Sequence, residues 1–89
     1  MLLLPTTLTQ NQAQGCLDEL TVGVQREADA QVVIDAAPLK SFDSSALAVL
    51  LAVRRECARA GKRFAVQGLP DRLRDLAALY GIEALLPSA

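Results

Sequence analysis

VVID at residues 32–35, followed after a short interval by FDSSAL at residues 42–47, is the stretch that decides the fold. The first segment joins two valines and an isoleucine to an aspartate, which is typical of a short parallel strand covered on both faces. Residues 36–41 contain a proline and have neither helical nor alternating periodicity, so we expect a loop. The apolar run from Ala46 to Val53 then indicates a helix that begins abruptly near residue 44.

Asp43, Ser44 and Ser45 mark the start of this helix. Asp and Ser are favoured there because their side-chain oxygens accept the unpaired N–H groups of the first turn. The same helix end carries a positive dipole and one or two hydroxyl groups, so a phosphate on Ser44 would be stabilised. From the residues alone two interpretations remain open: the serines only cap the helix, or Ser44 is a site of partner binding or phosphorylation.

Composition bounds the class of protein. The chain has 89 residues, 52% of them hydrophobic, which predicts one domain over residues 1–89. Its net charge of −1 gives no electrostatic argument for nucleic acid or an anionic membrane surface. The longest apolar run is too short to span a bilayer and the N-terminus lacks the features of a signal peptide, so we expect a cytoplasmic protein.

The residue inventory argues against enzymatic chemistry. The chain has no histidine, which excludes Ser–His and Cys–His couples and histidine metal sites. Its five glycines form neither a phosphate-binding loop nor a dinucleotide fingerprint. Cys16 and Cys57 are isolated in helical patterns, where small buried hydrophobic residues are the expected role. We therefore expect no catalytic residue, no cofactor and no metal.

The remaining elements alternate between strands and helices. This order predicts an α/β fold in which helices pack on a small mixed or mostly parallel sheet, joined by right-handed crossovers. The expected strands are 2–4, 32–35 and 62–67, with a weaker extended piece at 6–8, and the expected helices are 10–27, 44–60 and 71–80, with a final short turn or helix at 82–86.

The helix from Ser44 to about Ala60 is apolar on more than one side. A helical wheel places one set of residues on the core side, namely Ala46, Val49, Leu50, Val53, Cys57 and Ala60. Four further apolar residues lie beside or opposite that side, namely Leu47, Ala48, Leu51 and Ala52. Either a partner or loops of this chain cover them. Arg55 belongs to a charged second half that is solvated or forms ion pairs, and Tyr80 is expected in the core.

Residues 31–87 resemble the STAS domain, the module of anti-sigma-factor antagonists and of sulfate transporter tails. The resemblance is carried by the Ile34-Asp35 strand end, by FDSSAL at 42–47 and by GKRFAVQG at 61–68. It implies a STAS-type fold. In the antagonists the serine directly after the aspartate is phosphorylated, and that position is Ser44 here. Ala46 occupies a position where the family usually has glycine. Its methyl group would keep the backbone of another chain at a greater distance than glycine would.

The C-terminal segment, LAALYGIEALLP at 76–87, is similar to the end of the small MlaB-like STAS subunit of bacterial Mla-type phospholipid ABC transporters. This resemblance implies a non-catalytic subunit that binds the transporter ATPase, lies at the inner membrane through that partner and serves outer-membrane lipid asymmetry. The alternative is an anti-sigma-factor antagonist controlled by phosphorylation of Ser44. The expected contact residues are Asp43, Ser44, Ser45, Leu47, Ala48, Leu51 and Arg55.

Overall fold

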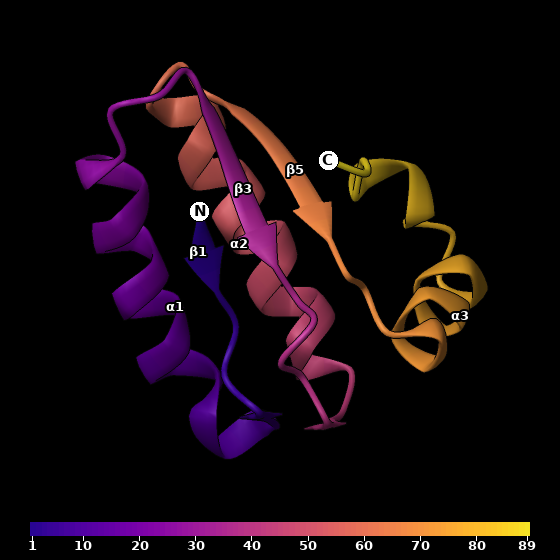
Figure 1. Ribbon diagram of the computed structural model, residues 1–89. Helices are drawn as coiled ribbons and strands as arrows, with labels where there is room; N and C mark the ends of the chain where they lie inside the picture. The colour runs from indigo at the N-terminus through magenta and orange to yellow at the C-terminus, as the bar shows by residue number, and fades with distance from the viewer.

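A computed structural model describes all 89 residues, and its helices and strands follow the predicted order (Figure 1). The fold is α/β, as predicted, with three α-helices and two small parallel sheets. The strands are β1 (Leu2–Leu3), β2 (Thr7–Leu8), β3 (Gln31–Asp35), β4 (Ser41–Phe42) and β5 (Arg63–Gln67); the helices are α1 (Gln10–Arg26), α2 (Ser45–Arg59) and α3 (Asp71–Leu79), with a 3-10 turn at Glu83–Leu85.

The main sheet has the order β1-β3-β5, and both of its pairings are parallel. Val32 lies opposite Phe64 and Ile34 opposite Val66, so the apolar residues of β3 and β5 share one face. α2 runs behind β3 and β5, α1 flanks it on one side, and α3 lies beyond β5 on the other (Figure 1). The main sheet therefore presents this apolar face to the helices.

The second sheet differs from the sequence-based expectation. Thr7 pairs with Ser41 and Leu8 with Phe42, so residues that we expected in or beside a loop form strand β4. Two residues are too few to show any periodicity, and only pairing with the distant β2 makes them a strand. This small sheet fixes the chain just before Asp43.

The buried residues form one continuous hydrophobic cluster between the sheet and the helices. Leu50 and Val53 of α2, Leu73 of α3 and Ile34 of β3 are completely buried. At about 25 cal/mol per Å² of buried apolar surface, each such side chain contributes about 1.5–3 kcal/mol. The core prediction for α2 is confirmed from Ala46 to Cys57 and is wrong for Ala60, which is exposed in the last turn.

Two helices end in the same way. Gly61 follows α2 with φ of 70°; its N–H donates to the Ala58 carbonyl at 3.1 Å, and the next N–H donates to the Cys57 carbonyl at 2.8 Å. These bonds form a Schellman motif, in which glycine takes the left-handed position without a steric penalty. Gly81 has the same φ and closes α3 likewise. The prediction that Tyr80 is core is wrong, because this turn leaves it 58% exposed.

Candidate functional site

Asp43 joins the starts of two helices. Its Oδ1 accepts the N–H of Ser45 at 2.8 Å, at the start of α2, and its Oδ2 accepts the N–H of Gln10 at 3.2 Å, at the start of α1. The Ser45 N–H above all, and the Gln10 N–H as well, lower the pKa of this carboxyl from its ordinary value of 3.8. Asp43 thus has a structural task, whether or not it also contacts a partner.

Ser44 stands beside this junction with a free hydroxyl. Its side chain is exposed and forms no hydrogen bond, whereas its carbonyl accepts the N–H of Leu47 at 3.1 Å inside the helix. The carboxylate of Asp43 therefore caps α2, and the Ser44 side chain is not needed for that purpose. Ser45 is half-buried. Of the two interpretations left open by the sequence, simple capping by Ser44 loses its basis.

The apolar residues outside the α2 core stripe fall into two groups. Leu47 is only 3% exposed and belongs to the hydrophobic cluster, so the expectation that it lies on a contact surface is wrong. Ala48 is exposed, and Leu51 is half-buried at the margin of the cluster. Ala46 is completely buried, so its methyl group packs inside the protein and does not limit the approach of another chain.

A shallow groove of about 280 Å³ separates α1 from the outer side of α2. Ala48, Ala52 and Arg55 form its α2 wall, and Ala13 and Leu17 form much of its α1 wall. Arg55 is exposed and forms no ion pair. Small side chains on the α2 wall allow another backbone to come close. We call this hollow the α1–α2 groove.

A second hollow, of about 460 Å³, lies on the α3 side of the α2 start. The Arg72 guanidinium stands 5.4 Å from the centroid of the Phe42 ring, a cation–π contact that ties α3 to β4. Leu79 is 78% exposed at its rim. We call it the α2–α3 hollow because its lining residues belong to α3 and to the segment just before the start of α2: Phe42, Asp43, Arg72, Asp75, Leu76 and Leu79.

Sequence reasoning missed Leu79 as a surface residue, although a signal was present. Leu79 lies about 120° around the helical wheel from Leu73, away from the α3 core face. A leucine at such an angle has no core to enter. The α1–α2 groove thus contains Ala48 and Arg55, and the α2–α3 hollow contains Asp43, the neighbour of Ser44 in the chain, together with Leu79, which the sequence analysis did not include.

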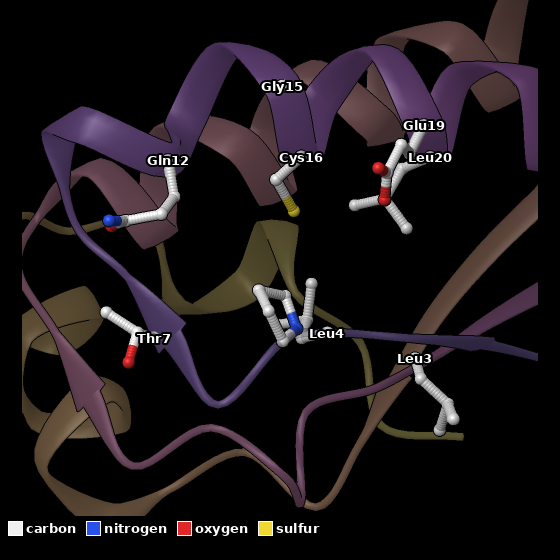
Figure 2. A pocket seen from close by; sticks show the side chains of 9 residues that line it. Leu3, Leu4, Thr7, Gln12, Gly15, Cys16, Glu19 and Leu20 are labelled. Atoms are coloured by element: carbon white, nitrogen blue, oxygen red, sulfur yellow. The ribbon is translucent and has the colours of Figure 1, made fainter.

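A third hollow, of about 450 Å³, lies between α1 and the β1–β2 segment (Figure 2). Cys16 points from α1 into this hollow, towards Leu4. Burial raises the pKa of the Cys16 thiol, and the charge of Glu19 adds to that effect. A thiol with a raised pKa stays protonated at neutral pH and is a poor nucleophile. The hollow therefore offers no activated group.

The chain has no group of three His, Cys, Asp or Glu side chains arranged to hold a metal ion. None of its helices has the length and the apolar character that crossing a bilayer requires.

Comparison with known proteins places the chain in a family. A search of curated proteins found no match. The family model described as "Mlab, STAS domain" matches residues 1–87, which is nearly the whole chain and includes both segments that carried the resemblance in the sequence. The parallel sheet, the cap at Asp43 and the exposed Ser44 therefore belong to a member of the MlaB-like STAS domain family.

Proposed function

We propose that this protein is the STAS subunit of a phospholipid-transport ABC system and that it binds the ATPase subunit through the first half of α2 and the neighbouring end of α3. It acts in the cytoplasm, at the inner membrane through its partner, and supports outer-membrane lipid asymmetry by stabilising or regulating the ATPase. It is not an enzyme and does not itself bind or hydrolyse ATP. The observation that carries this proposal is the MlaB-like family match over residues 1–87.

The surface around Ser44 supports a protein partner rather than a small ligand. Leu79 is a large side chain with 78% exposure, and Phe42 and Leu76 are half-buried beside it. Exposed apolar side chains of this size favour packing against a second chain, and the small Ala48 on α2 leaves room for that chain to approach. The α2–α3 hollow combines one arginine and two aspartates with three apolar residues, and such a mixture of polar and apolar side chains is common in protein interfaces.

Co-expression with the cognate ATPase, followed by gel filtration, tests the proposal. We expect the two proteins to elute together at micromolar concentration. Leu79→Arg should weaken the complex about tenfold or more, because it replaces an apolar anchor with a charge. Val22→Arg is the matched control, since Val22 is also an exposed apolar residue (44%) but lies on α1 outside both hollows. Separate elution of the unmodified proteins would refute the proposed function.

Ser44 provides a second test at the centre of the surface. Ser44→Glu should weaken ATPase binding more than Ser44→Ala, because a contact would bury an unpaired charge. Both variants should fold, since Asp43 supplies the capping oxygen and Ser44 supplies only backbone bonds. Circular dichroism checks folding and titration with the ATPase measures affinity. Equal affinities for the native protein and both variants would place Ser44 outside the interface.

The second candidate function is that of an anti-sigma-factor antagonist switched by phosphorylation at Ser44. The exposed hydroxyl without an internal hydrogen bond favours it, because a kinase can reach this group. The neighbouring genes discriminate between the two functions: a transporter subunit is expected beside an ATPase and a permease, and an antagonist beside an anti-sigma kinase and a sigma factor. Phosphate transfer to Ser44 from such a kinase, detected by mass spectrometry, would favour the antagonist.

A further inference from the structure

The outer edge of β5 is only partly paired. The Arg63 N–H donates to the Ala30 carbonyl and the Gln67 carbonyl accepts the Ala36 N–H, both at 2.9 Å, so these two residues direct their backbone groups towards the β3 side. Because backbone groups alternate along a strand, Phe64 and Val66 direct theirs to the outer edge. Val66 is satisfied there by the C-terminal tail, which pairs with it in parallel. Phe64 has no such partner.

The tail stops short of Phe64. The Val66 N–H donates to the Pro87 carbonyl at 2.8 Å, and the Ala89 N–H donates to the Val66 carbonyl at 3.0 Å. These two bonds are the whole of the pairing on this edge. The N–H and carbonyl of Phe64 therefore remain as one unpaired donor and one unpaired acceptor, spaced to receive an extended chain.

A hollow of about 400 Å³ adjoins this unpaired part of the edge. Three of the residues that line it carry a positive charge and none carries a negative charge: Arg54, Lys62 and Arg63. Arg54 and Arg63 form no ion pair and no side-chain hydrogen bond. Lys62 donates from Nζ to the carbonyls of Val24 and Glu27, so its charge is fixed beside the hollow. The Glu27 carboxylate interacts with Lys62 but does not line the hollow, so the two free arginines give the hollow its positive field.

We propose that this edge of β5 binds an extended acidic segment of a partner protein, which adds a short strand beside Phe64. Its backbone pairs with Phe64, and its carboxylates meet Arg54 and Arg63. A small anion such as phosphate could accept the Phe64 N–H and attract the arginines, but it would leave the neighbouring carbonyl to water. A peptide offers a donor and an acceptor at the required spacing, together with negative charge.

This site is separate from the proposed ATPase surface. The α2 residues that line the hollow, Arg54 and Ala58, lie 10 and 14 positions after Ser44, about 15 and 20 Å along the helix. Arg54 faces this hollow, whereas its neighbour Arg55 lines the α1–α2 groove. Failure of this proposal would therefore leave the function proposed above untouched, and the reverse also holds. The two sites can be mutated independently.

The test uses the full chain, labelled with ¹⁵N, and a blocked hexapeptide of alternating glutamate and valine. We expect the Phe64 amide resonance to shift and its hydrogen exchange to slow on titration. The same peptide with lysine in place of glutamate should bind at least about tenfold more weakly, because it would meet three cations. Binding of the glutamate peptide should also weaken as ionic strength rises.

Charge-reversal variants locate the site. Arg54→Glu together with Arg63→Glu should weaken binding of the glutamate peptide about tenfold, since two exposed pairs become repulsive. Arg74→Glu is the matched control, because Arg74 is an exposed arginine on α3 outside the hollow. Equal binding of both peptides, an unperturbed Phe64 amide, or equal affinity of the double variant would overturn the proposal. So would a response to inorganic phosphate at Arg54 and Arg63 with none to the peptide, which would indicate an anion site.

Discussion

The two sides of α2 contain similar residue types in opposite surroundings. On the inner side, Leu50 and Val53 are completely buried against the sheet. On the outer side, Ala48 is exposed and Leu51 is half-buried, although both side chains are also apolar. The inner side is explained by folding of this chain alone. The exposure of apolar residues on the outer side is not explained in this way, and it is on this side that we propose a partner binds.

The largest expected effect is on the inner side. Leu50→Arg should unfold the protein, because the side chain is completely buried among apolar residues and an unpaired charge there is not tolerated. Even Leu50→Ala should cost about 2–5 kcal/mol. Leu51→Arg should cost about 1 kcal/mol, since the arginine stem can lie over the margin of the cluster while its charge reaches water. Circular dichroism melts compare the three variants.

Leu50→Arg and Leu51→Arg together test whether the two sides of α2 differ as proposed. If Leu51→Arg melts as low as Leu50→Arg, then Leu51 is a core residue and the α2 surface is narrower than proposed. If Leu51→Arg melts near the native protein but also binds the ATPase with native affinity, the contact lies elsewhere. Only a folded variant with weakened binding supports the assignment.

A smaller effect on stability is expected at Asp43, which joins the starts of α1 and α2. The folded protein lowers the pKa of this carboxyl below 3.8, so ionised Asp43 stabilises the fold above that pH. This contribution is lost as pH falls through the lowered pKa. Asp43→Asn should therefore reduce the melting temperature at pH 7, and the difference from the native protein should shrink below about pH 4.

Asp75→Asn is the control for Asp43→Asn. Asp75 lines the same α2–α3 hollow but forms no hydrogen bond or ion pair, so its neutralisation should leave the melting temperature almost unchanged at pH 7. A difference between Asp43→Asn and native protein that stays constant from pH 7 to pH 3 would mean that the carboxylate charge does not secure the junction of α1 and α2.

Local chemistry explains how much of the fold the sequence could predict. The expected helix from Ser44 to about Ala60 begins and ends within one residue of α2, because Asp43 and Gly61 act on backbone groups nearby. The β4 strand was missed because its two residues are defined only by β2, more than 30 positions away. The residues that begin or end a helix lie next to that helix in the sequence. The partner of a short strand lies in a distant part of the chain, so the strand's own residues do not reveal it.

The candidate site, like the fold, was predicted only in part from the sequence. Ser44 was placed on the surface by its position at the helix start, Ala48 by its angle on the helical wheel and Arg55 by its charge, and each is exposed. Leu47 was misplaced because it lies only about 60° from Leu50, where neighbouring elements decide whether a side chain is covered. Leu79 was not predicted because it lies more than 30 positions after the FDSSAL motif, and only the folded chain brings the end of α3 beside Phe42 and Asp43.

The smallest effect on stability is expected at Ala48. A substitution there tests partner binding to the outer side of α2 with little change in folding. Ala48→Arg adds a long side chain to an exposed position, and arginine is a good helix former, so the free energy of unfolding should change by no more than about 0.5 kcal/mol. Binding to the ATPase should weaken, because the side chain would fill the α1–α2 groove where a partner backbone is proposed to approach. Ala58→Arg makes the same exchange at an exposed position near the other end of α2, and it should leave ATPase binding unchanged. If both variants bind with native affinity, the small residues of the outer side serve only the packing of α1 on α2, and the difference between the two sides of the helix needs no partner to explain it.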